Sequence, residues 1–311
     1  MKIVFMGTPE FGAIILEGLV KDDYKPALVI TEPDKPVGRK QIITPPPVKV
    51  TARKNNIEIL QPVKILDSKF YILDSKPDLI IVAAYGQILP KDILEIPKYG
   101  CLNVHPSLLP RWRGPSPIQF AILNGDEETG VTIMKITEKM DAGPVLTNSK
   151  LPILNSSITY EELHNKLAKE GAKLLLETIP KWLKGEIKPA AQDESKVTFS
   201  KILTRKDARI DWQKPAEEIE RQVRAFSFWP GTSALLDGKN LKIIKTSVME
   251  QTKNGPFGTP GKTFLAPDDK IAVQTGKGFL IIERLQLEGK NPVSAADFLK
   301  GHKDFIGKIL S

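Results

Sequence analysis

Residues 78–84 read DLIIVAA, and every residue after the first is apolar. An apolar run this short and without alternation is typical of a strand that is buried on both faces of a parallel sheet. Three similar runs precede it: KIVFM at 2–6, ALVIT at 27–31 and IEIL at 57–60. A helical pattern follows the first run, with apolar side chains near i, i+3 and i+4 spacing from Phe11 to Leu19. Strands that alternate with helices predict βαβ units, and therefore an open, mostly parallel Rossmann-like α/β sheet with helices on both faces.

The second half of the chain has a different pattern. Residues 158–183 predict a long helix that ends the first domain, and residues 184–206 are polar with few apolar positions. After a helix predicted over 215–226, short strand-like runs separated by Gly or Pro-Asp turns occupy 233–236, 241–248, 262–265, 270–274 and 279–285. Their regular spacing predicts a small β-barrel. We therefore expect a first domain at 1–189, a linker at 190–206 and a smaller domain at 207–311.

The composition indicates a globular protein of a reducing compartment. Hydrophobic residues make up 41% of the 311 residues and charged residues 26%. No apolar run is long enough for a transmembrane helix, and the first residues, MKIVFMGTPEF, lack the apolar core and cleavage site of a secretory signal. The single cysteine, Cys101, excludes an intramolecular disulfide and gives no basis for a thiolate zinc site. We expect a cytoplasmic protein with no membrane segment.

The basic charge is concentrated toward the second domain. The formal net charge is +8; residues 190–311 hold 20 basic and 15 acidic side chains, against 25 and 22 in residues 1–189. An excess of this size fits a polyanionic partner such as a nucleic acid, and it also fits an ordinary lysine-rich surface.

Residues 103–117, NVHPSLLPRWRGPSP, begin at the carboxyl end of a predicted strand at 101–104. Ligands of open α/β sheets bind beyond the carboxyl ends of the strands, which is where this stretch lies. Because residues two apart on a strand point to the same side, Asn103 and His105 face one pocket. Asn can donate to a developing oxyanion and His can exchange a proton near pH 7, but the pair also fits a structural histidine beside a turn-forming asparagine. The roles of Arg111 and Arg113, which flank Trp112, stay open.

Asp141 lies in the Gly/Pro-rich loop MDAGP at 140–144, after a predicted strand at 130–134. An aspartate in such a loop is usually a turn former. If the loop meets Asn103 and His105, however, Asp141 becomes the carboxylate that orients the histidine.

Several common site motifs are absent. The chain has no Walker motif, no G-x-S-x-G elbow and no H-E-x-x-H. Gly7 and Gly12 lack the spacing of a dinucleotide-binding loop, and Pro9 between them removes a backbone donor, so this stretch predicts a tight turn between strand and helix.

The stretches NVHPSLLPRWRGPSPIQ (103–119) and GDEETGVTIMKITEKMDAGPVL (125–146) resemble the 10-formyltetrahydrofolate-dependent formyltransferases. The resemblance implies that Asn103, His105 and Asp141 are the catalytic residues and that 10-formyltetrahydrofolate is the formyl donor. This scheme requires no metal, and the three scattered histidines suggest none. Four further stretches are similar to the family members that act on methionyl-tRNA: IVFMGTPEFG (3–12), EPDKPVGRK (32–40), AAYGQILP (83–90) and RAFSFWPGT (224–232). The resemblance covers essentially the whole chain.

The resemblance also assigns binding residues. It implies folate contacts at two loops and at the Asp141 loop; the residues are Ser107, Leu108, Leu109 and Pro110, and Tyr85, Gly86, Gln87, Ile88 and Leu89. It implies that the C-terminal domain is an OB-like β-barrel that holds tRNA. The 31–49 loop, whose prolines alone would indicate a stiff surface loop, would insert at the tRNA acceptor end through Arg39, Lys40 and Lys35.

Two positions depart from the family pattern. Gln41, Ile42 and Ile43 follow Lys40 where the family has a richer basic run, so this loop offers fewer cations to the acceptor arm. Phe228 stands where the family usually has proline, and nothing in the sequence explains it.

The function that these features imply is transfer of a formyl group from 10-formyltetrahydrofolate to the α-amine of methionyl-initiator tRNA, for translation initiation. The alternatives are formylation of an amino sugar nucleotide or another small amine, hydrolysis of the formyl folate, and a non-catalytic protein that binds tRNA or folate. The family also implies a monomer.

Overall fold

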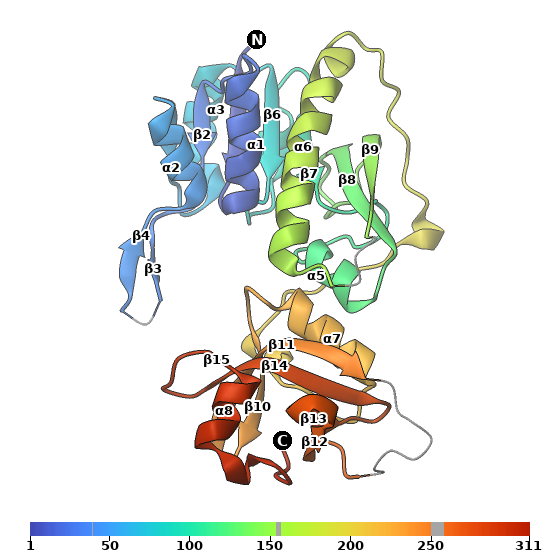
Figure 1. The fold of residues 1–311 in the computed structure, drawn as a ribbon. Coiled ribbons are helices and arrows are strands. Elements are labelled where there is room, and N and C mark those ends of the chain that lie inside the picture. The colour runs from blue at the N-terminus through green and yellow to red at the C-terminus, as the bar shows by residue number, and fades with distance from the viewer. Residues whose placement is uncertain (39, 154–156, 250–257) are drawn as a thin grey trace. The chain divides into compact units, whose positions relative to one another are not determined.

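The computed structural model describes residues 1–38, 40–153, 157–249 and 258–311, and these form two compact units (Figure 1). Unit 1 comprises Met1–Pro117, Glu127–Leu154 and Leu163–Ser200; unit 2 comprises Ile118–Asp126, Asn155–Glu162 and Lys201–Ser311. The domain boundaries expected at 189 and 206 stay predictions. The expected linker is not a separate segment in this division, because its residues up to Ser200 belong to unit 1.

Unit 1 is built on a sheet of seven described strands. In spatial order they are β5 (Glu58–Leu60), β2 (Leu28–Ile30), β1 (Ile3–Gly7), β6 (Leu79–Ala83), β7 (Cys101–His105), β8 (Glu128–Lys135) and β9 (Val145–Pro152). The first five strands are parallel, whereas β8 runs antiparallel to β7 and β9 antiparallel to β8. The expected mostly parallel sheet is therefore confirmed. The run that predicted it, β6, is buried along its whole length.

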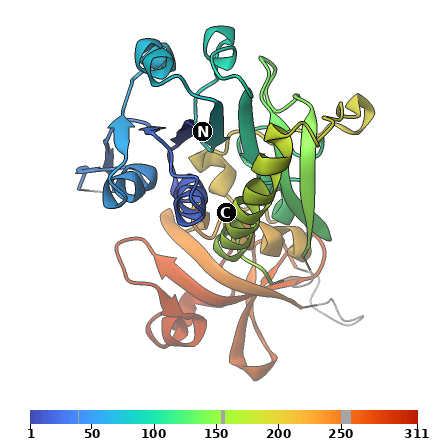
Figure 2. The ribbon, with the colours of Figure 1, turned by 90° about the horizontal axis from the view of Figure 1, so that it is seen from above.

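Helices cover both faces of this sheet, as expected. The helices of this unit are α1 (Glu10–Lys21), α2 (Pro47–Lys54), η1 (Ile65–Ser68), α3 (Lys69–Ser75), α4 (Lys91–Leu94), α6 (Tyr160–Leu183, in this unit from Leu163) and the short, exposed η2 (Glu194–Lys196). On one face α1 and α6 lie side by side (Figures 1 and 2), so close that a Cβ on Gly18 would lie 2.9 Å from that of Ala172. On the other face, side chains of η1, α3 and α4 such as Ile65, Ile72 and Ile93 pack on alternate residues of the buried strands.

Unit 2 is built on an antiparallel sheet. Its strands follow the order β10 (Thr232–Leu236), β11 (Lys239–Met249), β14 (Phe279–Leu287), β13 (Lys270–Gln274) and β12 (Thr263–Ala266), and β15 (Val293–Ser294) pairs with β14. The main chain of Leu310 and Ser311 bonds to Gly261 beside β12 and to Leu235 of β10. These last residues thus bridge the two edges of the path, which supports the closed sheet that the sequence predicts.

The remaining elements of unit 2 are helical: α5 (Pro117–Leu123, in this unit from Ile118), η3 (Arg205–Ala208), α7 (Ala216–Ala225), η4 (Pro267–Asp269), α8 (Ala295–Gly301) and η5 (Lys303–Phe305). The apolar faces of α7 and α8 join the core of the sheet through Ile219, Val223 and Phe298. The expected helix at 215–226 and all five expected strands are present.

The 31–49 segment contains structure that the sequence pattern did not predict. Strands β3 (Lys35–Val37) and β4 (Ile42–Thr44) form an antiparallel hairpin whose described residues are exposed. Pro47 then opens α2, a position where its missing N–H and its φ are compatible with a helix. No helix in the described ranges has the length and apolar character needed to span a bilayer.

Candidate active site

Strand β7 carries Asn103 and His105 and lies where the strand pairing of the sheet changes from parallel to antiparallel. Asn103 pairs with parallel β6 through Val82 and with antiparallel β8 through Met134. As the two-residue spacing predicts, both side chains reach the same third residue, Asp141. The imidazole is 4% exposed, and the carboxamide is half-buried.

Asp141 lies between the two. Asn103 Nδ2 donates to Asp141 Oδ1 across 3.4 Å, and the same oxygen lies 3.7 Å from His105 Nδ1. The other oxygen, Oδ2, accepts the backbone N–H of Gly114 at 2.8 Å. The structure therefore brings together the three residues expected to be catalytic, which lie on two segments 36 residues apart along the chain.

The tautomer of His105 follows from its second ring nitrogen. His105 Nε2 lies 3.0 Å from the carbonyl oxygen of Trp112. Because a carbonyl oxygen only accepts, Nε2 must carry a proton, and in the neutral ring Nδ1 then holds the lone pair. The proton-accepting atom of His105 is thus the one that faces Asp141. The backbone of Trp112, which supplies the carbonyl, has a positive φ of 57°, a region that non-glycine residues rarely occupy.

The segment that follows His105 is pinned by residues 190–200, which the sequence suggested only as a surface linker. Arg113 N donates to the Thr198 carbonyl, and Ser200 N donates to that of Arg113. Gly114 has φ +108°, and a Cβ there would lie 2.5 Å from the Ser200 carbonyl oxygen, so glycine is required on both grounds. Of the two arginines left open by the sequence, Arg111 stacks on the Trp112 ring and Arg113 turns inward, where its side chain is 5% exposed.

The 107–110 loop, expected to contact folate, is held against β8 by a residue that the sequence did not single out. The Thr132 hydroxyl donates to the Ser107 carbonyl at 2.7 Å and accepts the Leu109 N–H at 3.1 Å. The Ser107 hydroxyl is also engaged internally, with the carbonyl of Arg111. Leu109 is buried, while Leu108 and Pro110 are partly exposed. The only feature of the sequence that could have indicated this support is a threonine within a predicted strand that is otherwise apolar.

The 85–89 loop offers mostly main chain to a ligand. Tyr85 and Leu89 are buried in the core cluster beneath the sheet, and burial raises the pKa of the Tyr85 phenol to about 12. The Gln87 side chain bonds the main chain of Val63 and Ile65. Gly86 and Ile88 are exposed.

Two of the three cations expected to bind tRNA lie within the described residues, and Arg39 lies outside them. Lys35 is exposed and pairs with Glu32 at 2.7 Å, and Lys40 is exposed at the end of the β3–β4 hairpin. Lys49, in contrast, is buried and bonds both oxygens of Asp34 at 2.6 and 2.7 Å. This bond and a second from Gln61 hold the pKa of Asp34 below its usual range. The Lys49 pair therefore belongs to the base that supports the hairpin.

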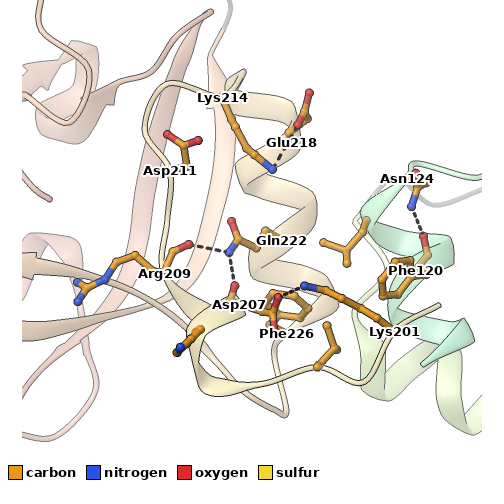
Figure 3. A pocket seen from close by; sticks show the side chains of 13 residues that line it. Phe120, Asn124, Lys201, Asp207, Arg209, Asp211, Lys214, Glu218, Gln222 and Phe226 are labelled. Atoms are coloured by element: carbon orange, nitrogen blue, oxygen red, sulfur yellow. Dashed lines mark hydrogen bonds and ion pairs between the residues drawn. The ribbon is translucent and has the colours of Figure 1, made fainter. Parts of the chain in front are cut away.

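Unit 2 contains a cavity of about 360 Å³ that holds none of the expected site residues (Figure 3). Its lining mixes both signs of charge: Phe120, Leu123, Asn124, Lys201, Leu203, Lys206, Asp207, Arg209, Asp211, Lys214, Glu218, Gln222 and Phe226. Lys201 bonds Asp207 and lowers its pKa to about 2, and Gln222 Nε2 donates to the carbonyls of Asp207 and Arg209. The two Gln222 bonds tie α7 to the segment before it. Across the described residues, no group of three or more His, Cys, Asp or Glu side chains could hold a metal ion.

Two family models match the chain. One, described as formyl transferase, matches residues 1–179, and the other, described as formyl transferase, C-terminal domain, matches residues 202–303. Among solved structures, the sugar 3N-formyl transferase WlaRD, in the presence of dTDP and 5-N-formyl-THF, has a TM-score of 0.65 at 24% identity and covers 94% of this chain and 99% of its own. HypX from Aquifex aeolicus, in complex with tetrahydrofolic acid, has a TM-score of 0.63 at 19% identity over 98% of this chain and 48% of its own.

At these identities the two structures share the fold, and this chain spans about half the length of HypX. A curated relative is much closer in sequence. The methionyl-tRNA formyltransferase of Geobacillus sp. (strain WCH70) is 46% identical over 304 residues, which are 97% of this chain and 94% of that protein. With both family models and a full-length relative in agreement, the chain belongs to the formyltransferase family and, within it, to the methionyl-tRNA formyltransferases.

Proposed function

We propose that this chain transfers the formyl group of 10-formyltetrahydrofolate to the α-amine of the methionine carried by initiator tRNA. The observation that carries the proposal is the meeting of Asn103, His105 and Asp141 at the carboxyl end of β7, in a chain of this family. The family uses a tetrahydrofolate-derived donor, and we propose the 10-formyl form as the donor here.

His105 accepts the proton that the amine loses as its nitrogen bonds the formyl carbon. When the bond from that carbon to N10 of the folate breaks and tetrahydrofolate leaves, N10 takes the proton back from His105. Nδ1 of His105 is the only ring atom free for these steps, because Nε2 donates to the Trp112 carbonyl. The imidazolium that forms lies 3.7 Å from the Asp141 carboxylate, and the opposite charge stabilises it. The Gly114 N–H on the far oxygen keeps that carboxylate in position.

Asn103 supplies a donor for the formyl oxygen as negative charge develops there. Its hydrogen bond to Asp141 is long, so its amide can turn toward a stronger acceptor. A single preorganised donor of this kind stabilises the transition state by roughly 2.7–4 kcal/mol.

We further propose where the substrates lie. The 85–89 and 107–110 loops follow the carboxyl ends of β6 and β7, and the Asp141 loop reaches Asn103 and His105 from the end of antiparallel β8. These three loops take the folate. Lys35, Lys40 and Arg39 contact the phosphates of the acceptor end, with the more basic C-terminal domain holding the rest of the tRNA. We infer a monomeric enzyme of the cytoplasm.

The proposal is tested by incubating the purified protein with 10-formyltetrahydrofolate and methionyl-initiator tRNA and measuring formylmethionyl-tRNA. We expect catalytic turnover with the tRNA and none with a dTDP-linked amino sugar or with glycinamide ribonucleotide. Transfer to one of these small amines instead, or release of formate without transfer, would replace the proposed substrate. Binding of tRNA and folate without turnover would mean a non-catalytic protein.

A further inference from the structure

The 190–200 segment reaches the Asp141 loop through one side chain, that of Gln192. Its Nε2 donates to the carbonyl oxygens of Asp141 and Gly143, each at 2.8 Å. Its Oε1 accepts from Arg113 Nε at 3.0 Å. The NH₂ group and the oxygen of the Gln192 side chain are therefore both hydrogen-bonded. The two bonds of the NH₂ group go to the loop that carries Asp141, a proposed catalytic residue.

Arg113 determines which way the Gln192 amide points. Its guanidinium also bonds both oxygens of Glu194, at 2.7 and 3.3 Å, and holds the pKa of that carboxyl below its usual range. Because Arg only donates, Oε1 of Gln192 must face it, and the NH₂ group must face the two carbonyls. A flipped amide would set an oxygen against two carbonyl oxygens and an NH₂ against a cation. The orientation is thus imposed by charge and hydrogen bonding together.

The Asp141 loop needs this support because its backbone is unusual. Asp141 has a positive φ of 49°, which costs a non-glycine residue about 1–2 kcal/mol. Gly143 runs so close to β8 that a Cβ would lie 1.8 Å from the Lys135 carbonyl oxygen. The two carbonyls that flank this bend are the two that Gln192 holds. Releasing them frees the bend, and with it the direction of the carboxylate.

We propose that Gln192, oriented by Arg113, is a positioning residue that sets the Asp141 carboxylate against His105 and Gly114. This inference rests on the proposed function for its kinetic part only. It assigns Arg113, one of the two arginines that the sequence left without a role, to the support of the catalytic loop rather than to a substrate.

One test needs no activity. The Gly114 amide donates to Asp141 Oδ2, so its hydrogen exchange, followed by NMR, reports whether the carboxylate is in place. We expect Gln192→Ala and the isosteric Gln192→Glu, which keeps the shape but loses the donor, to speed this exchange about tenfold, and we expect the same of Asp141→Ala, which removes the acceptor itself. Lys196→Ala is the matched control on the same segment; it removes only an exposed ion pair with Asp193 and should leave the exchange unchanged.

The kinetic test separates positioning from general stability. We expect Gln192→Ala to lower kcat for formyl transfer about 10- to 100-fold, with the KM of both substrates within about threefold of wild type. In an Asp141→Ala background the same substitution should cost less than about twofold more, because the residue it positions is already gone.

The exchange and kinetic results can each contradict the positioning role of Gln192. An unchanged Gly114 exchange in both Gln192 variants overturns the inference, and so does a loss of kcat that is as large in the Asp141→Ala background as in wild type. Should the wild-type protein transfer no formyl group at all, the proposed function fails, while the exchange measurement still tests the coupling of Gln192 to Asp141.

Discussion

Replacing Asp141 with asparagine removes one charge and leaves the shape of the site intact. The amide oxygen of the variant can still accept the Gly114 N–H, which fixes the direction of the new NH₂ group toward His105. That NH₂ then donates to Nδ1, the atom that must accept the proton from the amine. The substitution therefore removes the stabilisation of the imidazolium and occupies the lone pair of the neutral ring.

The magnitude follows from the separation of 3.7 Å between Asp141 Oδ1 and His105 Nδ1. Two unit charges at this distance attract by about 1 kcal/mol in bulk water and by about 4 kcal/mol at an effective dielectric constant of about 20. Since 1.36 kcal/mol changes a rate tenfold, this range corresponds to a loss of about 5-fold to about 1000-fold in kcat. The two side chains are only 5% and 15% exposed, so the upper part of the range applies.

The assay is formyl transfer under single-turnover conditions, with saturating 10-formyltetrahydrofolate and methionyl-tRNA. The matched control is Asp74→Asn, which makes the same chemical change at an exposed position of α3. A variant that keeps kcat within threefold of wild type, or that loses activity only through KM for the tRNA, would refute the pairing of Asp141 with His105.

Three further predictions concern groups outside the proposed catalytic residues. Thr132→Val leaves two main-chain groups of the 107–110 loop without a partner, so the free energy of unfolding in urea should fall by about 1–3 kcal/mol and folate binding, followed by fluorescence, should weaken; unchanged values for both would contradict the support we assign to this hydroxyl. Burial raises the pKa of the Cys101 thiol to about 12, so iodoacetamide at pH 8 should label it only after unfolding, and rapid labelling of the native protein would contradict this. Asp207, whose pKa is lowered from 3.8 to about 2 by its bond to Lys201, adds at most about 2 kcal/mol of stability that is complete above pH 4 and is lost as the pH falls through about 2. Asp207→Asn should therefore have a lower free energy of unfolding in urea than wild type at pH 7, and the difference should shrink toward pH 2. If the difference in unfolding free energy stays the same at pH 2, another contact is responsible.

Much of the fold could be predicted from local patterns because burial leaves a period in the sequence. The apolar run of β6 and the spacing of α1 predicted the parallel sheet, and the short runs after residue 230 predicted the antiparallel one. The β3–β4 hairpin was missed because its two strands are exposed, only three residues long and without alternation, with Pro36 inside the first strand and prolines at 45–47 after the second. The segment after residue 184 looked like a linker because its residues bind through polar side chains and main chain, which carry no hydrophobic period.

For the site, the sequence by itself determined that Asn103 and His105 share one side of a strand end, since that follows from backbone geometry over two residues. Family resemblance then pointed to Asp141. Only the tertiary structure decided that Nδ1 of His105 is the available nitrogen, that Gly114 holds the carboxylate, and that Gln192 and Arg113 hold its loop. The last three contacts join residues 27, 51 and 79 positions apart. Such contacts depend on how separate segments pack, and a single polar residue in an irregular segment leaves no pattern from which its partner can be predicted.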